Sequence, residues 1–433
     1  MKKILAVALL LLSAAFLANA QTGNWSGKLD VRGTPLTIVF HLDGDEPTLD
    51  SPDQAAQGIP VQIERTAVGG ITIKIPSLMA SYEGIWAGKQ ILGTFKQAGL
   101  SLPLALTPEK KRNRPQTPVG PFPYAEEEVT FTNGEAKLAG TLVLPEGYTR
   151  KTPVLIMVTG SGQEDRNEEI FEHKPFAVIA DALARAGIAT LRCDDRGVGG
   201  STGDVMEATT IDFKEDALAG IKLLRERFDK VGVIGHSEGG TIALMLAAEG
   251  QADFIISLAG MVVSGIELLV AQSRTALEAA GHPEDQIETV CEAIGEAAYV
   301  RVHGGRMPFP DELDVPDVLK QVYQSVMIQI QTPWMRKLLS LDMRPKLGGI
   351  TCPVLALNGT KDIQVDYESN LGALREGLPA SPKNKIEAID GVNHLFQHCT
   401  TGAVAEYRNI EETFAPEALE LMVQWLAQVT ARN

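Results

Sequence analysis

The chain has 433 residues, a formal net charge of −16 at pH 7 and only four cysteines. This length is enough for two or three domains with ample hydrophobic cores, and the acidic balance disfavours nucleic acid and anionic membrane surfaces as partners. The cysteines (Cys193, Cys291, Cys352 and Cys399) form no C-x-x-C pair and no zinc-type cluster with histidine, so we expect neither a metal site nor a cofactor. The sequence does not pair them, and it leaves the oligomeric state open.

The first twenty residues have the three parts of a secretory signal peptide. Two lysines precede an apolar run over residues 4–17, and Ala18-Asn19-Ala20 forms an A-x-A cleavage site. We therefore expect residues 1–20 to be removed and the protein to be exported to the periplasm or the extracellular space. The alternative is a membrane anchor, for which this run is short, and no other segment reaches the length of a spanning helix.

Residues 21–107 show the pattern of a small all-β domain. Short apolar or alternating runs are separated by turns rich in glycine and aspartate. The runs are Leu36–Leu42, Val61–Ile63, Ile71–Ile75, Ile91–Phe95 and Leu102–Leu106. Five prolines then follow within residues 108–123, where a helix is disfavoured and a semi-extended linker is expected. We place the domain boundary in this linker.

Residues 124–433 have the pattern of an α/β domain with a mostly parallel sheet flanked by helices. Apolar runs without alternation are separated by helical segments, which indicates strands covered on both faces. After two strand candidates (Glu127–Phe131 and Gly140–Leu144), these runs are Val154–Val158, Ala189–Cys193, Val231–Ile234, Phe254–Leu258, Val354–Leu357 and Lys385–Ile389. Residues 262–341 form a long insertion with helical spacing, which is interpreted either as a cap over a site or as ordinary packing helices.

A serine motif follows the run Val231–Ile234. Gly235-His236-Ser237-Glu238-Gly239-Gly240 connects this run to an apolar helical segment. A strand, a tight turn and a helix of this kind form a nucleophile elbow, in which glycines two residues before and after the serine let strand and helix approach closely. The sequence therefore predicts Ser237 as a catalytic nucleophile. The alternative is a structural turn that matches G-x-S-x-G by chance.

A serine hydroxyl needs a base beside it in space, and the chain has seven histidines. His394 follows the last apolar run, in the loop where hydrolases with a nucleophile elbow carry the base. His398 lies one helical turn later and is interpreted as a supporting or core residue. His236 belongs to the elbow itself and is expected to point elsewhere. We therefore predict His394 as the general base.

The third expected member of the site is a carboxylate that fixes the tautomer of the histidine and stabilises the imidazolium. Asp362 follows the run Val354–Leu357, in the loop where this acid is expected. Asp366 and Asp390 are the alternatives. The sequence thus predicts a Ser-Asp-His triad in the chain order of hydrolases with an elbow.

Two backbone N–H groups have to face the oxyanion of the transition state. One is expected from Glu238, the residue after the serine. The other is expected from the loop Thr159–Gln163, with Ser161 as first choice because it follows a glycine and Gln163 as second. The glycine-rich segment Arg192–Ser201 lacks the spacing of a phosphate-binding loop and contains two aspartates, so it is interpreted as a structural loop beside the site.

These motifs resemble those of secreted bacterial esterases of the α/β-hydrolase superfamily, which are related to dienelactone-hydrolase-like and prolyl-oligopeptidase-like enzymes. The matching segments are Gly160-Ser161-Gly162 with Asp165-Arg166-Asn167, Asp194–Gly199, Gly235–Gly240, Cys352–Gly359 and Asn393–Gln397, and more loosely Ser51–Gln54 and Gly93–Phe95. The resemblance implies an α/β-hydrolase fold and hydrolysis of esters with short acyl chains by the triad above. Many relatives carry histidine at the position of Thr159. This difference lies in the loop that is expected to supply the second oxyanion donor. The family does not define the substrate.

We therefore expect a serine carboxylesterase that acts on a small-molecule ester. One alternative is a serine peptidase of the prolyl-oligopeptidase-like group, although such peptidases usually carry a much larger additional domain. Another is a non-catalytic protein that binds an envelope component. The insertion, with the residue before it, supplies apolar side chains that favour small neutral acyl groups or simply form core: Met261, Leu268, Leu269, Met327, Ile328 and Trp334.

Overall fold

The computed structural model describes residues 23–431 apart from 32–33, 44–46, 55, 67–68 and 110–111, so the expected signal peptide lies outside the described residues. The chain divides into two compact units, one made of Met1–Asn113 with Val404–Asn409 and the other of Arg114–Ala403 with Ile410–Asn433. The division falls inside the proline-rich segment that the sequence indicates as a linker. The assignment of residues 404–409 to the first unit has no counterpart in the sequence prediction. Within this unit, Arg408 forms an ion pair with Glu109, which is far from it in the chain.

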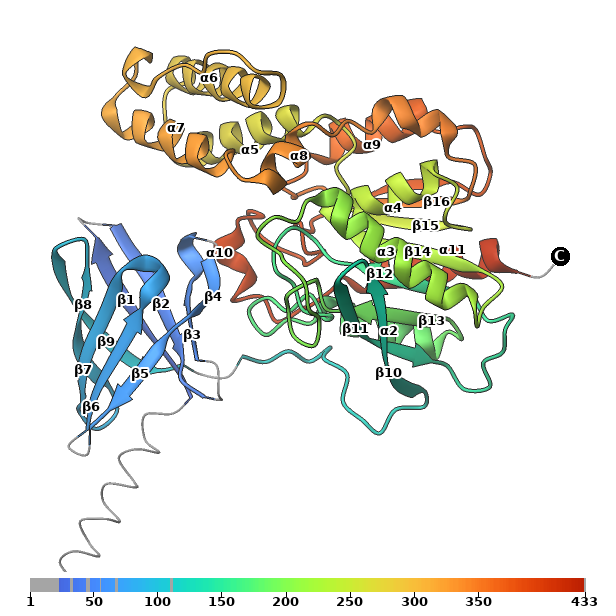
Figure 1. Ribbon diagram of the computed structural model, residues 1–433, viewed down its shortest axis with the longest axis horizontal. Helices are drawn as coiled ribbons and strands as arrows, with labels where there is room; N and C mark the ends of the chain where they lie inside the picture. The colour runs from blue at the N-terminus through green and yellow to red at the C-terminus, as the bar shows by residue number, and fades with distance from the viewer. Residues whose placement is uncertain are drawn as a thin grey trace, which may run out of the picture. The chain divides into compact units, whose positions relative to one another are not determined.

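The first unit is a nine-stranded antiparallel sheet in the order β4-β3-β2-β1-β9-β8-β7-β6-β5 (Figure 1). The strands are β1 Asn24–Val31, β2 Thr34–His41, β3 Thr48–Ser51, β4 Ala56–Pro60, β5 Gln62–Arg65, β6 Gly70–Ile75, β7 Ala80–Trp86, β8 Ile91–Gln97 and β9 Leu100–Pro108, and a short helix, α10, spans Val404–Tyr407. The aromatic side chains of Trp25, Phe40 and Tyr82 are buried at its core. Apart from β1 with β9, the paired strands are neighbours in the chain, which is why local turn signals predicted the all-β class.

The second unit is built on an eight-stranded sheet in the order β10-β11-β13-β12-β14-β15-β16-β17. Its strands are β10 Ala125–Asn133, β11 Ala136–Leu144, β12 Val154–Val158, β13 Ala189–Cys193, β14 Val231–His236, β15 Ile255–Leu258, β16 Val354–Gly359 and β17 Lys385–Ile389. β10 and β11 are antiparallel to their neighbours, whereas the other strands are parallel. The predicted α/β-hydrolase architecture with a mostly parallel sheet is confirmed.

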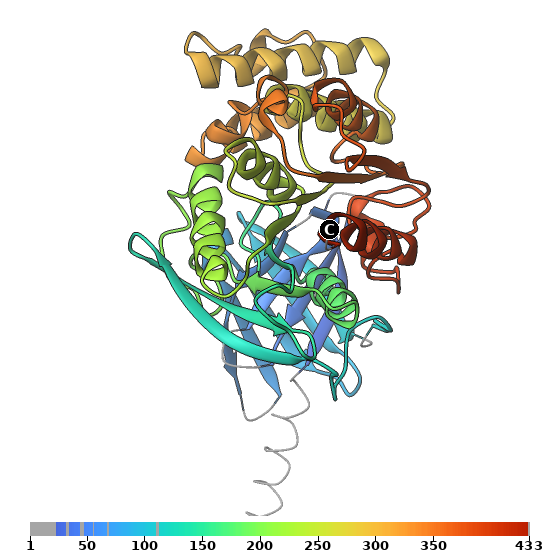
Figure 2. The ribbon, with the colours of Figure 1, turned by 90° about the vertical axis from the view of Figure 1, so that its right-hand side faces the viewer.

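Helices cover both faces of this sheet, and two separate hydrophobic clusters hold them there. On one face lie α3 Thr210–Arg225, α4 Glu238–Ala248 and α9 Tyr367–Gly377, and on the other α2 Pro175–Arg185 and α11 Pro416–Thr430. Figure 2 shows α3 and α11 on opposite sides of the strands. The strands between them are apolar on both faces, because neither face meets water.

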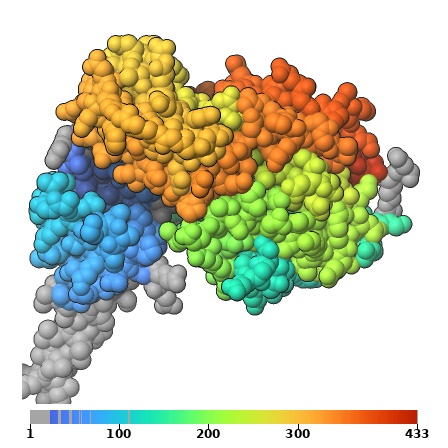
Figure 3. Space-filling model, turned by 45° about the horizontal axis from the view of Figure 1, so that its top comes forward, coloured from blue at the N-terminus to red at the C-terminus, as the bar shows by residue number. Residues whose placement is uncertain are grey.

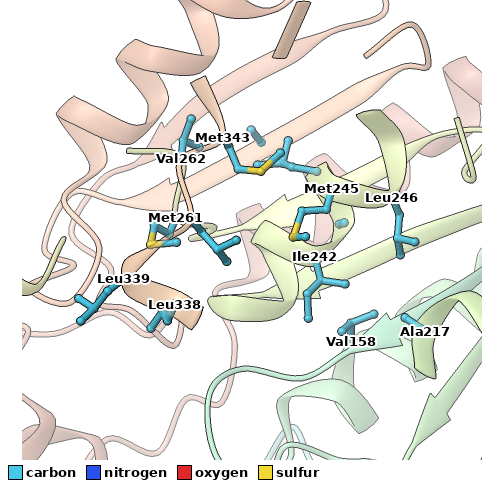
Figure 4. Close-up of a cluster of buried hydrophobic side chains, with 14 of the residues drawn as sticks. Val158, Ala217, Ile242, Met245, Leu246, Met261, Val262, Leu338, Leu339 and Met343 are labelled. Atoms are coloured by element: carbon cyan, nitrogen blue, oxygen red, sulfur yellow. The ribbon is translucent and has the colours of Figure 1, made fainter. Parts of the chain in front are cut away.

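The insertion between β15 and β16 is helical and belongs to the second unit. It contains α5 Gly265–Ala279, α6 Glu284–His303, α7 Asp317–Gln329 and α8 Pro333–Leu339, which cover one side of the unit (yellow to orange in Figure 3). Figure 4 shows Leu338 and Leu339 of α8 and Met261 near Ile242 and Met245 of α4, all in one hydrophobic cluster. The base of the insertion is therefore continuous with the core of the sheet.

All four cysteines have free thiols in this structure. Among the described residues, no helix combines the length and the apolar character that crossing a bilayer requires.

Candidate active site

Ser237 lies in a sharp turn between β14 and α4. Its backbone has φ 54° and ψ −117°, a conformation that is strained for a residue with a side chain. A Cβ atom at Gly235 would lie 2.0 Å from the carbonyl oxygen of Gly239, and one at Gly239 would lie 2.1 Å from that of Val158. Only glycine fits at both positions, so the glycine spacing in the sequence has a steric cause.

The structure brings Asp362 and His394 together from the loops after β16 and β17. Nδ1 of His394 lies 2.7 Å from Oδ2 of Asp362, and both side chains are almost fully buried. The other carboxylate oxygen accepts the N–H groups of Gln364 and Val365 at 2.8 and 2.9 Å, which holds the acid in one orientation. Because an ionised carboxylate only accepts hydrogen bonds, Nδ1 carries a proton, and Nε2 of a neutral ring is left as an acceptor.

The residues considered as alternatives bind elsewhere. Both ring nitrogens of His398 pair with surface carboxylates, Glu412 at 2.9 Å and Glu417 at 3.0 Å, and the side chain is half-exposed. Asp366 caps the N-terminus of α9. Asp390 accepts a hydrogen bond from a threonine hydroxyl. Among the acids considered, Asp362 is the one that contacts a histidine of the predicted site.

The loop after β12 contains the residues predicted to donate to an oxyanion. Ser161 and Gln163 are exposed, whereas the N–H of Gly160 is occupied by the carboxylate of Glu168 at 2.8 Å. The choice between Ser161 and Gln163 stays open. Glu238, the other predicted donor, is the first residue of α4, where a backbone N–H has no carbonyl partner within the helix.

A partly buried aspartate closes this loop. The carboxylate of Asp195 accepts the hydroxyl of Thr159 at 2.6 Å and the N–H of Glu164 at 3.0 Å, so it joins the two ends of the loop. Burial raises the pKa of Asp195 to about 7, although these two hydrogen bonds act in the opposite direction. The segment Arg192–Ser201, interpreted from sequence as structural, thus supports the loop beside the elbow.

The side chain of Glu238 links the elbow to two other segments. One of its oxygens accepts the hydroxyl of Ser161 at 2.9 Å, and the indole Nε1 of Trp334 lies 3.0 and 3.1 Å from the two oxygens. Burial raises the pKa of Glu238, and these donors oppose that shift. Since Trp334 belongs to α8, the inserted helices reach Glu238, the residue next to Ser237.

The other apolar residues singled out in and beside the insertion differ in burial, and Leu268 and Met327 are partly buried against the main hydrophobic cluster. Met261 and Leu269 are buried in the hydrophobic cluster that includes the sheet. Ile328, in contrast, is 68% exposed on α7, so it belongs neither to a core nor to an enclosed acyl pocket. Helix α7 is covered on the part that carries Leu319 and Tyr323, which are buried, whereas Ile328 lies on the part that stays exposed. Helical periodicity alone does not tell which face of such a helix is covered.

Both ring nitrogens of His236 face groups other than Ser237, in line with the expectation that it points elsewhere, but the ring lies beside the predicted base. Its ring lies 4.7 Å from that of His394 between centroids, with its Nε2 2.9 Å from the backbone carbonyl oxygen of His394. Its Nδ1 lies 2.9 Å from Oε1 of Glu168. Glu168 was not predicted from the sequence, because it lies 68 residues before His236 and belongs to no motif that links the two. The only signal was its place in an acidic segment shortly after the oxyanion loop.

A pocket of about 40 Å³ lies beside the loop Thr159–Gln163, lined by residues of β12, α3 and α4, Glu238 among them, and by Asp195. Among the described residues, no group of three or more histidine, cysteine or acidic side chains has the geometry to hold a metal ion. The side chains gathered at the site are Ser237, two adjacent histidines and the buried acids Glu168, Glu238 and Asp362.

Comparison with known proteins places these residues in a family. The family model described as Hydrolase_4, serine aminopeptidase S33, matches residues 172–398, just over half of the chain, and this stretch includes Ser237, Asp362 and His394. Esterase EstD of Thermotoga maritima is 27% identical over 286 residues, which cover 64% of this chain and 61% of EstD. The chain thus matches less than two thirds of that relative's length.

Solved structures with some similarity include an esterase of Pyrococcus furiosus, at 16% identity and a TM-score of 0.44, covering 75% of this chain and 99% of that one. Another is a proline iminopeptidase of Mycobacterium smegmatis, at 16% identity and a TM-score of 0.43, covering 70% and 99%. The family model extends over more than half of the chain and contains the elbow, the acid and the histidine described above. The chain belongs to the Hydrolase_4 family of serine hydrolases, and it has the α/β-hydrolase fold.

Proposed function

We propose that this protein is a serine carboxylesterase in which Ser237 is the nucleophile, His394 the general base and Asp362 the acid that orients it. The observation that carries the proposal is the 2.7 Å contact between His394 and Asp362, made by loops that follow two adjacent parallel strands. The strained turn at Ser237 and the family model support the same roles. The similarity to an esterase supports esters as substrates.

In the proposed reaction, Oγ of Ser237 attacks the ester carbonyl carbon while its proton passes to Nε2 of His394. The carbon–oxygen bond to the alcohol then breaks, and the alcohol leaves with that proton. Water attacks the acyl-enzyme in the same way, which releases the carboxylic acid and restores the serine. The backbone N–H of Glu238 and one from Ser161 or Gln163 stabilise the oxyanion in both steps.

A peptidase activity remains the second candidate, because the family model is described as a serine aminopeptidase. An aminopeptidase has to bind a substrate ammonium group, for which a carboxylate is the usual partner. Glu238 is the carboxylate next to Ser237 in the chain, and its side chain is buried and bonded to Ser161 and Trp334. This engagement of Glu238 favours neutral esters.

The test compares p-nitrophenyl esters of increasing acyl length with aminoacyl p-nitroanilides, using the intact protein and Ser237→Ala. We expect turnover of acetyl and butyryl esters, little turnover of the anilides, and loss of ester turnover in Ser237→Ala. Ser381→Ala, at an exposed turn, is the matched control and should behave as the intact protein. Ester hydrolysis that survives Ser237→Ala would exclude the proposed mechanism, and a strong preference for anilides would favour the peptidase.

The proposal includes export, which rests on the pattern of residues 1–20. Fractionation of cells that express the full chain should place the protein outside the cytoplasm, with a mature N-terminus at residue 21. A cytoplasmic protein that keeps Met1 would contradict it.

A further inference from the structure

The ring of His236, the residue before the nucleophile, lies between two hydrogen-bond acceptors. Nδ1 is 2.9 Å from Oε1 of Glu168, and Nε2 is 2.9 Å from the carbonyl oxygen of His394. A neutral imidazole has one N–H and can donate to only one of them. A ring that is protonated on both nitrogens satisfies both, provided that Glu168 is ionised.

The surroundings of this pair favour the charged form. The side chains of His236 and Glu168 are 7% and 6% exposed, and each charge in so buried a place requires the other. Burial alone would lower the pKa of His236. The charge and hydrogen bond of Glu168, the carbonyl of His394 and the charge of Asp362 outweigh burial and raise that pKa to about 9. Glu164 is a further acid close enough to interact with the ring.

Glu168 is held in an unusual backbone conformation while it makes these contacts. Its φ is 53°, in the left-handed region that residues with side chains seldom adopt, and its N–H donates to the carbonyl of Asp165 at 2.8 Å. The same Oε1 that faces His236 accepts the N–H of Gly160 at 2.8 Å. Strain of this kind persists where the surrounding structure fixes it, often at functional sites.

We infer that His236 and Glu168 are positioning residues, an ion pair that ties the candidate oxyanion loop to the backbone of the catalytic base. The connection runs from the N–H of Gly160 to Glu168, from Glu168 to His236, and from His236 to the carbonyl oxygen of His394. Because His236 is also bonded covalently to Ser237, one chain of contacts joins the oxyanion loop, the nucleophile and the base. The inference rests on the proposed function, in which these three parts act together.

The kinetic test uses the full chain with His236→Gln and Glu168→Gln. In His236→Gln, the glutamine can donate to the carbonyl oxygen of His394 but carries no positive charge to pair with Glu168. In Glu168→Gln, the negative charge of the pair is removed instead. We expect kcat for a short p-nitrophenyl ester to fall about 10- to 100-fold, because small misplacements of reacting groups cost about this much, with KM within about threefold. The matched control is His398→Gln, which removes a half-exposed histidine paired with Glu412 and should leave kcat unchanged.

A second measurement reports the protonation directly and does not require activity. The histidine ring nitrogens are labelled with ¹⁵N, and the signals of His236 are assigned by their absence in His236→Gln. At pH 7.5 we expect protons on both nitrogens of His236, in the intact protein and in Ser237→Ala, and on one nitrogen only in Glu168→Gln. A single ring proton in the intact protein would overturn the inference, as would an unchanged kcat in both variants.

The two proposals fail in different ways. If Ser237→Ala keeps full ester turnover, the proposed function is wrong, whereas the nitrogen spectrum of His236 still decides the ion pair. If Ser237→Ala is inactive but His236 carries one proton, the esterase proposal stands and the positioning role falls. Circular dichroism and the unfolding midpoint of each variant show whether a loss of kcat reflects unfolding, in which case the nitrogen spectrum of the intact protein alone decides.

Discussion

Helix α4 and the inserted helix α7 lie in the same unit but differ in how they are packed. Every residue of α4 from Glu238 to Ala247 is buried, whereas α7 buries Leu319 and Tyr323 and exposes Val318 and Ile328 at 54% and 68%. Reacting groups have to be held within fractions of an ångström, which requires contacts from all sides. A helix of an insertion needs only one covered face. We therefore expect changes around α4 to be far more costly than changes on α7.

The largest expected effect concerns the acid of the site. Asp362→Asn replaces a pure acceptor by a group that can also donate, so the tautomer of His394 with a proton on Nδ1 loses its partner. By analogy with serine hydrolases of other folds, kcat should fall on the order of 10³- to 10⁴-fold with the fold intact. The control is Asp390→Asn, which changes an acid outside the pair. Steady-state kinetics on a p-nitrophenyl ester checks this, and a loss of less than tenfold would remove Asp362 from the triad.

The next effect concerns the turn itself. Gly239→Ala places a methyl group 2.1 Å from a carbonyl oxygen of β12, so strand and helix have to separate. We expect the free energy of unfolding to fall by about 3 kcal/mol, because overpacking of a rigid core has this cost. Gly372→Ala in α9 is the matched control, since its new methyl group meets no atom within 4 Å and should stabilise the helix by about 0.5–1 kcal/mol. Urea unfolding measures both, and equal effects would show that the elbow is adaptable.

The ion pair of His236 predicts a pH dependence of stability. A histidine whose pKa is raised from 6.5 to about 9 on folding stabilises the native state fully below pH 6.5, and this contribution is lost as the pH rises through 9. The loss should be on the order of 3 kcal/mol between these limits. His236→Gln should remove this slope. Burial also raises the pKa of Asp195 to about 7 and that of Glu164 well above its usual range, and each of these acids costs stability as the pH rises, so the part of the slope that His236→Gln removes is what reports the ion pair. A flat profile above pH 6.5 in the intact protein would contradict the assignment.

A smaller effect is expected at the contact between α4 and the inserted helix α8. Trp334→Phe keeps an aromatic ring on α8 but removes the indole N–H, so the buried carboxylate of Glu238 loses one of its donors. We expect a loss of about 1 kcal/mol of stability and a shift in the preferred acyl length. Ile328→Ala on α7 should change neither by more than about 0.5 kcal/mol. An unchanged chain-length profile in the tryptophan variant would show that this part of the insertion does not contact the acyl group.

Local features were sufficient to predict the class of both units and most of their strands. The buried parallel strand Val154–Val158 was predicted with its actual limits, because a strand covered on both faces is apolar throughout. Lys385–Ile389, at the edge of the sheet and only partly buried, was also predicted with its actual limits. β1, β3, β4 and β7 of the first unit were not identified. Their alternation is interrupted by small or polar residues, and their pairing with other strands is what makes them strands.

The sequence by itself determined Ser237, Asp362 and His394 as candidates, because an elbow needs glycines at fixed positions and the chain order of the three parts leaves few choices. Only the tertiary structure decided which buried groups surround them. The partnership of His236 with Glu168 and the contact of Glu238 with Trp334 join residues 68 and 96 positions apart. Such contacts depend on how loops and helices come together after the strands have paired, and no local periodicity records them.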